Sequence, residues 1–596
     1  MKKSVITLAM LLAMQIYLYA QAPASGIVNI VELSQGPSAY AMGNNITRLW
    51  ADDNLNTVAF LHRVYPALGT THLAYDLSTN SGETWTLNIP VYDPGQGGLP
   101  AYFAQGGIYN PAGNTNPELA YYTWFALSQD GQYLSGIHKL DQSSNPVFNV
   151  WNGASCSGPM AFTINPLSGD VFAVAPVVTM SGYDDSLAVS RGVFNETSGN
   201  YNFSQVLLPL PAQPGGLEKP LDLKISFGPD GLTGYISMIF DNLMDPFAAG
   251  GGVYPILLKT TDGGITWSDP SAVILGGPLG LPEVKNYISE DILQILFMEF
   301  GGIHRDSVVY QTAYEHGLGV DMYGNPHICV TIGVSGVHFE EPYAINAGYG
   351  YGATFHLFSL DQGSTWIGRY ITHNKTFRGC HDDLCMDNRS QVSTTADGSV
   401  MVFSWSDSDF EGVYENILPD IWCQGYDVET QLFTDFFNVT FLSDVWLEAY
   451  MAVAPPIILS EDNKFLIPFA LQTIPGGDPV LPVQYKYVSD FIIAPYDYLL
   501  LSVLDQITDH SSLWVSQCYP NPAREITSIA IDLQQPMEVK IEISNLHGQK
   551  LYFENKGVLF SGRHVVKMDI SVLAPGIYFY TIRANDYIQT RKMVVQ

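Results

Sequence analysis

Acids interleaved with aromatic side chains form the loop best suited to bond-breaking chemistry. This loop runs from Ser406 to Trp422. Four of its acids stand out as candidates: Asp407, Asp409, Glu411 and Asp420. Two carboxylates at a defined separation can hydrolyse a glycosidic bond, and flat aromatic rings beside them suit the faces of a sugar. We therefore take the four acids as candidate catalytic residues. The alternative is a solvated loop in a very acidic protein.

The segment from Arg378 to Arg389 is unusually polar and is a candidate metal site. Its hard oxygen donors are Asp382, Asp383, Asp387 and Asn388. Such oxygens suit Ca²⁺, although their spacing is not that of an EF-hand. Cys380 and Cys385 lie in the same loop, and with His381 they suggest zinc, but export into an oxidising compartment favours a disulfide. We predict a disulfide-pinned loop, with a Ca²⁺ site as the alternative and no other cofactor.

The common catalytic signatures are missing from the sequence. It contains no HExxH, no P-loop, no GxSxG and no dinucleotide-binding fingerprint. Glycine-rich stretches are not followed by helical patterns, so we interpret them as loops.

Composition excludes two classes of partner and favours one fold class. The 596 residues include 58 acids against 26 Lys and Arg, for a net charge of −32. Nucleic acids and anionic membranes bind clustered Lys and Arg, so neither is expected as a partner. With 46% hydrophobic residues, 54 Gly and 36 Pro, the chain can bury large cores and favours strands and turns. We expect an all-β protein.

One pattern recurs through the middle of the chain: an apolar strand, a tight turn with Asp, Asn or Gly, and a second apolar strand. It occurs at residues 49–60, 110–122, 162–174, 225–236, 320–330, 392–403 and 458–467. The turns are about 68 residues apart on average, which exceeds a compact propeller blade of about 45 residues and requires long loops. In the widest gap, apolar spacing over residues 282–300 predicts one inserted amphipathic helix.

A second repeated element contains a tryptophan. Three segments, residues 78–85, 260–267 and 359–366, align without gaps. The aligned positions are Asn80, Gly82 and Trp85; Asp262, Gly264 and Trp267; and Asp361, Gly363 and Trp366. Side-chain oxygens can bond turn N–H groups, glycine can take a positive φ, and the tryptophan can pack on outer strands.

These three segments resemble the Asp-box, or BNR repeat, of sialidase-like β-propellers. The resemblance implies a propeller over residues 27–510 with about seven blades, six to eight being the range. It also implies that the boxes lie at the blade periphery, away from the binding face, so they report the fold. Radial stacking of the blades would then supply the core.

The same resemblance raises an enzymatic alternative. Sialidases of this fold use an arginine triad, a Tyr–Glu nucleophile pair and an acidic Asp. The nearest match to their Arg-Ile-Pro motif is Arg63-Val-Tyr-Pro66, which is one residue too long. Nothing in the spacing of the arginines selects a triad, so we favour a non-catalytic role.

The first 20 residues predict a secretory signal peptide. Lys2 and Lys3 precede an apolar run from Val5 to Leu18, and Ala20 and Gln21 fit a cleavage site. An anchoring helix is the alternative, but the run is shorter than the ~20 residues of a membrane span. No later segment is apolar for long enough, so no transmembrane segment is expected in the mature chain.

The last 78 residues predict a separate β-sandwich after a linker at 511–518. Tyr519-Pro-Asn-Pro522 forms a rigid entry turn, and Val539 to Ser544 alternates strictly. With Gly576-Ile-Tyr578 and the terminal strand 591–595, residues 519–596 resemble the type A sorting domain of the type IX secretion system of Bacteroidota. The resemblance implies export through that machinery, followed by surface attachment or release.

The sequence thus predicts a secreted or cell-surface β-propeller followed by an Ig-like sandwich. Its partner is the secretion machinery, and its propeller is expected to bind a glycan or a surface protein without catalysis. Two alternatives remain: a sialidase-like glycoside hydrolase with paired carboxylates in the propeller mouth, and an adhesin or scaffold without a deep polar pocket. The sequence does not select the ligand.

Overall fold

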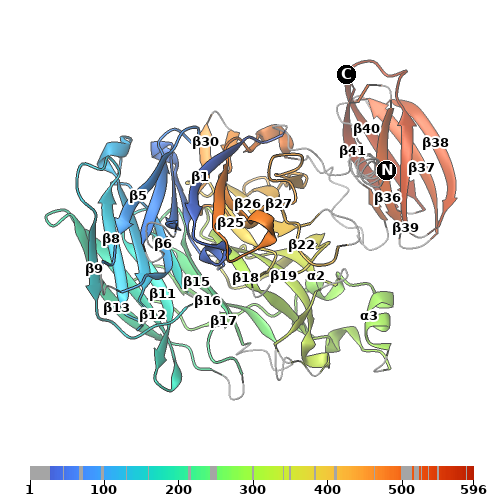
Figure 1. Ribbon diagram of the computed structural model, residues 1–596. Coiled ribbons are helices and arrows are strands. Elements are labelled where there is room, and N and C mark those ends of the chain that lie inside the picture. Colours follow the sequence, from blue (N-terminus) through green and yellow to red (C-terminus); the bar gives the residue numbers. More distant parts are fainter. Residues whose placement is uncertain are drawn as a thin grey trace, which may run out of the picture. The chain divides into compact units, whose positions relative to one another are not determined.

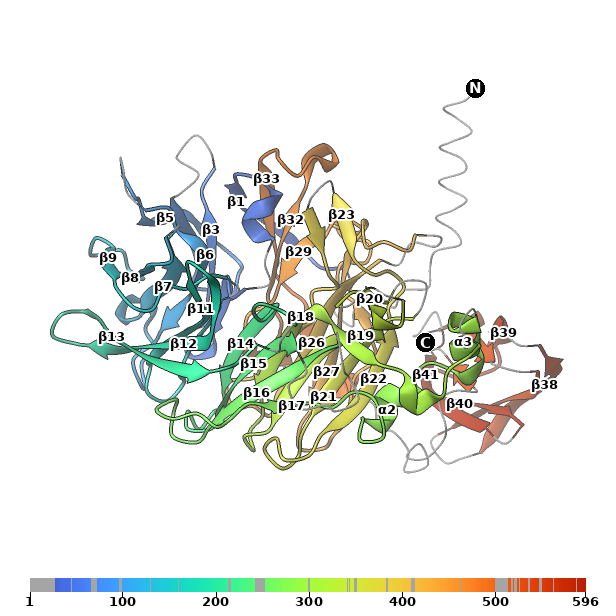
Figure 2. The same ribbon diagram turned by 90° about the horizontal axis from the view of Figure 1, so that it is seen from below.

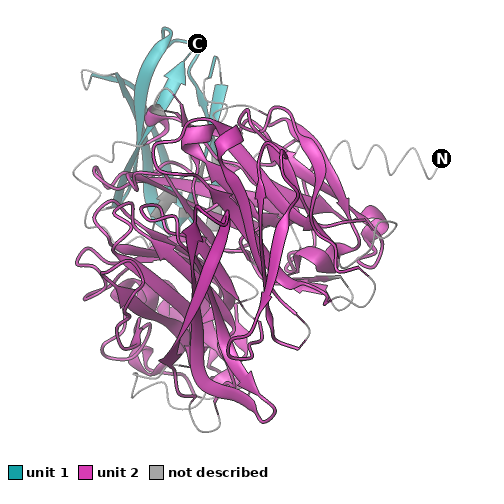
Figure 3. Ribbon diagram, turned by 90° about the vertical axis from the view of Figure 1, so that its left-hand side faces the viewer, with its two compact units in different colours: residues 1–21, 500–596 teal, residues 22–499 magenta. Residues whose placement is uncertain are grey.

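The computed structural model divides into two compact units, residues 22–499 and residues 1–21 with 500–596 (Figure 3). It describes residues 27–43, 46–65, 72–95, 99–128, 130–158, 160–212, 216–241, 252–298, 301–339, 341, 343–347, 351–381, 384–408, 413–461, 464–498, 513–515, 518, 523–524, 526–533, 536–545, 549–560, 562–585 and 587–595. The predicted signal peptide, residues 1–20, lies outside this set.

Seven antiparallel sheets follow one another along the larger unit (Figure 1). The first sheet contains β2 (Leu49–Asp52), β3 (Thr57–Arg63), β4 (Leu73–Ser78) and β5 (Thr86–Tyr92), and the second contains β6 (Tyr102–Tyr109), β7 (Tyr121–Leu127), β8 (Tyr133–Lys139) and β9 (Val147–Trp151). The third contains β10 (Ala161–Ile164), β11 (Val171–Thr179), β12 (Gly182–Asn195) and β13 (Asn200–Pro209). The fourth contains β14 (Asp222–Phe227), β15 (Gly234–Asp241), β16 (Val253–Thr260) and β17 (Ser271–Ala272). The fifth is β18 (Tyr310–Val320), β19 (Pro326–Ser335), β20 (Ile345–Asn346), β21 (Ala353–Phe358) and β22 (Ile367–His373), and the sixth is β25 (Gln391–Thr394), β26 (Val400–Asp407), β27 (Asp420–Asp427) and β28 (Phe437–Asn438).

The seventh sheet closes the ring. Its order is β1 (Ile30–Gly36), β33 (Val483–Val488), β32 (Phe469–Thr473) and β29 (Tyr450–Val453), so the first strand of the chain completes the last sheet. Val31 pairs with Tyr487 in this register, and Figure 2 shows β1 beside β33. Such a closure joins the two ends of the array and leaves no open end in the ring.

The first strands of successive sheets line a common axis. The strand β6 contacts both β2 and β10, and β14 contacts β10 and β18, which in turn contacts β25. Glycine permits the closest approach: a Cβ on Gly317 would lie 2.5 Å from the backbone of Gln391 in the next sheet. This arrangement is a β-propeller, as the sequence predicted. The described residues form seven such sheets. The predicted number of blades, seven, stays a prediction.

Six of the seven predicted hairpins join the first and second strands of a sheet. The hairpin predicted at 458–467 is different. It forms β30 (Leu459–Glu461) and β31 (Lys464–Leu466), which pair with β34 (Ile492–Ile493) in a small separate sheet. The prediction found a real hairpin there but placed it in the wrong sheet, because local turn chemistry does not specify which strands pair at long range.

The three tryptophan segments share one geometry, and each joins the third and fourth strands of its sheet. In the second copy, Thr260 Oγ1 donates to Asp262 Oδ1 (2.8 Å) and accepts from Gly264 N (3.0 Å), while Asp262 Oδ1 also accepts from Thr266 N (2.9 Å). The other copies make the same three bonds at 2.7–3.0 Å. Glycines 82, 264 and 363 have φ of 93°, 85° and 91°. The half-buried tryptophans Trp85, Trp267 and Trp366 pack on neighbouring strands.

The inserted segment before the fifth sheet is two short helices and not the single helix predicted. They are α2 (Pro282–Asn286) and α3 (Glu290–Leu296). The break comes at Ser289, whose hydroxyl accepts from Ile292 N at 3.4 Å and caps the second helix. The predicted apolar face was Ile288, Ile292, Ile295 and Leu296, and of these Ile288 is buried whereas Ile292 and Ile295 are exposed. The buried face is instead Val284, Ile288 and Leu293, because the cap at Ser289 starts a new helix with a different orientation.

The smaller unit is the predicted β-sandwich. One sheet has the order β35 (Leu513–Val515), β36 (Ile526–Leu533) and β39 (Gly562–Asp569). The other has the order β38 (Lys550–Leu559), β37 (Met537–Asn545), β40 (Gly576–Ala584) and β41 (Tyr587–Val595). The alternation predicted on β37 buries Val539, Ile541 and Ile543 in the core. The predicted linker at 511–518 contains β35, which pairs with β36, so the sandwich begins before Tyr519.

Among the described residues, no helix is both long enough and apolar enough to cross a membrane.

Candidate functional site

A polar cavity of about 300 Å³ opens where the first strands of the propeller sheets meet. Its charged and aromatic lining residues are Phe103, Asp222, Tyr314, Glu315, Arg378 and Asp387. They come from β6, β14, β18 and the segment that leads into β25, with Gly43 and Ile46 ahead of β2 completing the wall. Strands of three sheets and the segments ahead of two others therefore contribute to one cavity at the axis, which is where a propeller presents a ligand site.

Strand irregularities turn side chains into this cavity. The register of β6 shifts between Tyr102 and Gln105, and that of β18 shifts between Thr312 and His316. A bulge of this kind bends a strand and re-aims the side chains inside it. Phe103 lies in the first bulge and Glu315 in the second, and both line the cavity.

Two residues of the cavity wall have a strained backbone. Phe103 and Arg378 have positive φ, of 52° and 40°. A non-glycine residue in this region costs about 1–3 kcal/mol. The fold thus maintains an unfavourable backbone at two positions of the cavity wall.

The first carboxylate of the cavity, Asp222, is saturated by internal donors. Lys224 Nζ donates to both of its oxygens, at 2.6 and 2.7 Å. The backbone N–H of His316 (2.9 Å) and its Nδ1 (2.8 Å) both bond Asp222 Oδ2. Burial alone would raise the pKa of Asp222, but the charge of Lys224 and the contacts with His316 outweigh it and hold the pKa at about 2. This carboxylate is a fixed anion with a structural role.

The second carboxylate, Asp387, is likewise occupied. Its Oδ1 accepts from Arg378 Nε at 2.9 Å, and its Oδ2 accepts from Tyr314 N at 2.9 Å. Arg378 also stacks over the ring of Tyr314, with 4.7 Å from its guanidinium carbon to the ring centre. The Arg378 side chain remains 38% exposed, so its guanidinium faces the cavity while one nitrogen anchors it.

The third carboxylate, Glu315, differs from the other two. It meets Arg389 in an ion pair of 3.6 Å, which is too long for a hydrogen bond, and its Oε2 is buried without a partner. Burial raises the pKa of Glu315 to about 7, opposed by Arg389 and assisted by the anions Asp387 and Asp222. Glu315 is therefore the cavity group that can change charge near neutral pH.

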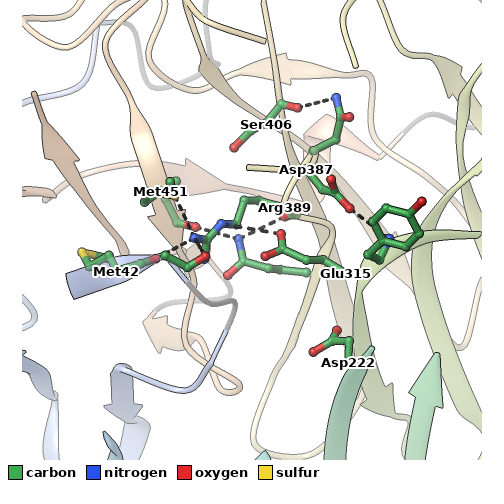
Figure 4. A network of polar contacts seen from close by, with 12 residues as sticks. Met42, Asp222, Glu315, Asp387, Arg389, Ser406 and Met451 are labelled. Carbon is green, nitrogen blue, oxygen red and sulfur yellow. Dashed lines mark hydrogen bonds and ion pairs between the residues drawn. The ribbon is translucent and has the colours of Figure 1, made fainter. Parts of the chain in front are cut away.

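Arg389 forms an ion pair with Glu315 and also contacts residues from other parts of the propeller (Figure 4). It is fully buried, and its Nη2 donates to the carbonyl oxygens of Met42 (2.6 Å) and Gly43 (3.0 Å) and lies 2.8 Å from Met451 Sδ. Its Nε and Nη1 have no hydrogen-bond partner. A buried guanidinium with unpartnered N–H groups is costly and rare in native structures.

Of the four acids predicted to be catalytic, the two that the structure describes do not line this cavity. Asp407 and Asp420 lie opposite each other on β26 and β27, and both are less than 5% exposed. Asp407 accepts four hydrogen bonds from residues 375, 376 and 408, and Asp420 accepts from Thr440 and Leu447. These bonds fix adjacent loops to the sixth sheet. Asp409 and Glu411 lie outside the described residues.

Of the four predicted calcium ligands, the structure describes two, and both have partners within the protein. Asp387 is bound to Arg378, and Asn388 Nδ2 donates to the carbonyls of Thr376 and Ser406, each at 2.9 Å. Asp382 and Asp383 lie outside the described residues. In the part of the chain that the structure describes, no three His, Cys, Asp or Glu side chains group as metal ligands. Calcium binding stays a prediction.

Cys380 and Cys385 form a disulfide across a two-stranded hairpin, β23 (Gly379–His381) and β24 (Leu384–Met386). Arg378 precedes this hairpin and Asp387 follows it, so the bridge closes the loop that carries both residues. The remaining cysteines, Cys156, Cys329, Cys423 and Cys518, are buried and form no disulfide among the described residues.

We expect the double variant Cys380→Ser with Cys385→Ser to lose about 2 kcal/mol, because the bridge closes a ring of only a few residues. The loss should be local, so the amides of the hairpin should exchange faster with deuterium than in wild type. The comparison is hydrogen exchange followed by mass spectrometry, with reduced wild-type protein as the matched control. Equal exchange in this hairpin in all three samples would contradict the expectation.

Sequence reasoning missed the two acids that matter most here, Asp222 and Glu315. The available signal was weak: Glu315 and His316 are adjacent in a strand that contains no other charged residue or histidine. Arg378, Asp387 and Arg389 did stand out as part of a polar segment, although for a metal site.

Comparisons with known proteins bear on the two units differently. Residues 517–596 match the family described as the secretion system C-terminal sorting domain. This confirms the predicted sorting module and indicates a secreted or cell-surface protein. A search of curated protein sequences found no match to the chain.

Solved structures with a similar arrangement are distant. PorZ, a surface component of the type IX secretion system of Porphyromonas gingivalis, is 12% identical over 93% of this chain and 60% of that chain, with a TM-score of 0.34. The present chain thus spans less than two thirds of PorZ. Trypanosoma rangeli sialidase is 9% identical over 82% of this chain and 83% of that chain (TM-score 0.37). Penicillium chrysogenum α-L-arabinanase is 10% identical over 79% and 100% (TM-score 0.32). Such scores carry no argument about function, and the fold rests on the sheet topology above.

Proposed function

We propose that this protein is a surface-directed binding propeller that captures a ligand in its axial cavity without hydrolysing it. The main support is the state of the three cavity carboxylates. Glycoside hydrolysis needs two carboxyl groups that are both available to the substrate. Asp222 accepts four internal hydrogen bonds and each oxygen of Asp387 accepts one, so among the described lining residues only Glu315 retains a buried, unpartnered oxygen.

A binding site needs only groups that contact the ligand, and the cavity contains such groups. Arg378 can present guanidinium N–H groups beyond the one given to Asp387, and Glu315 can accept from or donate to a ligand according to its charge. The rings of Phe103 and Tyr314 add apolar faces. A polar cavity of this kind favours a small ligand over the alternative of an adhesin that uses the propeller only for flat protein contact.

The hydrolase alternative has one observation in its favour. A carboxyl group with a pKa of about 7 suits a general acid at neutral pH, and Glu315 has such a pKa. A second carboxylate would then have to come from residues outside the described set.

For the sorting module, we propose that it is removed after export, leaving the propeller attached to the surface or released.

The test uses the mature exported protein, probed on a glycan array and incubated with a panel of fluorogenic glycosides. We expect saturable binding that falls at least tenfold in Glu315→Gln, with no turnover above buffer. The control is Glu83→Gln on an exposed outer hairpin, which should bind as wild type. Turnover that disappears in Glu315→Gln would make the protein a hydrolase, and the absence of both binding and turnover would refute a role for the cavity.

A further inference from the structure

The cavity also contains information on the class of its ligand. Each of its three carboxylates has one internal cation: Lys224 for Asp222 at 2.6 Å, Arg378 for Asp387 at 2.9 Å, and Arg389 for Glu315 at 3.6 Å. Of these cations only Arg378 lines the cavity, together with all three acids. An anionic ligand would therefore lie beside three carboxylates and would have to compete with Asp387 for the single exposed guanidinium.

A ligand ammonium is unsuited for a different reason. The Glu315–Arg389 contact leaves both an acceptor and donors without partners: Oε2 of Glu315, and Nε and Nη1 of the fully buried Arg389. Figure 4 shows the two side chains pointing toward each other. Arg389 does not line the cavity, so of these groups only the Glu315 carboxyl can meet a ligand. A carboxyl group that gains or loses its proton changes between donor and acceptor, whereas a ligand ammonium can only donate and a ligand carboxylate can only accept. A hydroxyl group does both, so it can bond Glu315 whichever charge that residue carries.

The volume of the cavity and the chemistry of its walls indicate the same class of ligand, one that carries hydroxyl groups. A volume of about 300 Å³ lies at the lower end of ligand pockets and suits a single ring rather than an oligomer. The walls combine the rings of Phe103 and Tyr314 with the aliphatic side chains of Ile46 and Leu221. A group with hydroxyls around its edge and C–H surfaces on its faces satisfies both kinds of wall.

We infer that the axial cavity binds a neutral, hydroxyl-rich ring of one-sugar size and discriminates against anionic sugars. This inference rests on the proposed binding function and specifies its ligand. The ring is either a free sugar or the terminal residue of a longer glycan, and these two sources share the same recognising chemistry.

The experiment is saturation-transfer NMR and calorimetry on the mature protein with three groups of probes. The neutral probes are the methyl glycosides of glucose, galactose, mannose and N-acetylglucosamine; the anionic probes are glucuronic and N-acetylneuraminic acid; the cationic probe is glucosamine. We expect at least one neutral probe to bind at least tenfold more tightly than every charged probe. Binding of array glycans but not of monosaccharides would assign the ligand to a chain terminus.

Two variants make the result specific. Glu315→Gln should weaken the binding of the neutral probes and reduce the difference in affinity between them and glucuronic acid, because it removes one of the carboxylates that repel an anion. Phe103→Leu keeps an apolar wall but removes the ring, and it should weaken neutral probes tenfold even if Glu315→Gln does not fold. Glu83→Gln is the unchanged control. Tighter binding of an anionic or cationic probe would overturn the inference while leaving the binding function intact; no binding on the array or in the panel would refute both.

Discussion

The variant Arg389→Leu should unfold its propeller at a much lower urea concentration than wild type, with a loss of about 3–5 kcal/mol in the free energy of unfolding. The guanidinium contacts the carbonyls of Met42 and Gly43 ahead of the first sheet, Met451 of the seventh and Glu315 of the fifth, and it belongs to the segment that leads into the sixth. Removing it leaves these carbonyls and a carboxylate buried without a donor, which costs more than the lost bonds themselves.

The loss should depend on pH in a defined direction. Without Arg389, the pKa of Glu315 rises further above that of an unfolded glutamate, 4.5. The folded variant then binds a proton that the unfolded chain has released, so its stability falls as the pH rises from 4.5 through the raised pKa. The difference between variant and wild type should therefore be larger at pH 8 than at pH 5.

Tryptophan fluorescence in urea measures this, because nine of the ten tryptophans lie in residues 22–499. The double variant Arg389→Leu with Glu315→Gln should recover part of the loss at pH 8 and little at pH 5. Lys139→Met, which breaks an exposed ion pair with Asp141, is the control and should unfold as wild type. A loss below 1 kcal/mol at pH 8 would mean that the axial ion pair does not hold the sheets together.

Local chemistry made much of the fold predictable from the sequence. The hairpin of residues 260–267 depends on hydrogen bonds within five residues and on a positive φ that glycine adopts freely, so its sequence pattern and its structure coincide. The alternation on β37 likewise determines which face is buried. Ring closure was not predictable in this way, because β1 pairs with β33 from the opposite end of the unit.

The cavity was less predictable for a related reason. Glu315 faces the axis only because β18 is bulged, and Phe103 and Arg378 have backbone conformations that their residue types disfavour. Such conformations are maintained by the surrounding sheets and leave no signature in the local sequence. Conversely, Asp407 and Asp420 resembled catalytic acids because acids stand between aromatic residues there, but the fold uses them to accept hydrogen bonds from loops.

Acid should destabilise the propeller through Asp222 and His316, and Asp222→Asn should separate their contributions. The unfolded aspartate has a pKa of 3.8 and the folded one about 2, so the stabilisation is fully present above 3.8 and is lost as the pH falls through 2. It amounts to about 2 kcal/mol. Burial lowers the pKa of His316 below the 6.5 of the unfolded chain, so stability also falls as the pH decreases from 6.5.

The substitution Asp222→Asn removes the carboxylate but keeps its shape. At pH 7 we expect a loss of about 3–5 kcal/mol, because the ammonium of Lys224 loses its bidentate partner and an amide N–H group can face the N–H of His316. Between pH 4 and 2 the variant should lose less further stability than wild type, since the group that titrates there is gone. The measurement is the urea midpoint from pH 8 to pH 2, with Asp184→Asn at the exposed start of β12 as the control. Parallel curves for Asp222→Asn and wild type below pH 4 would show that this carboxylate is not the acid-sensitive anchor of the cavity.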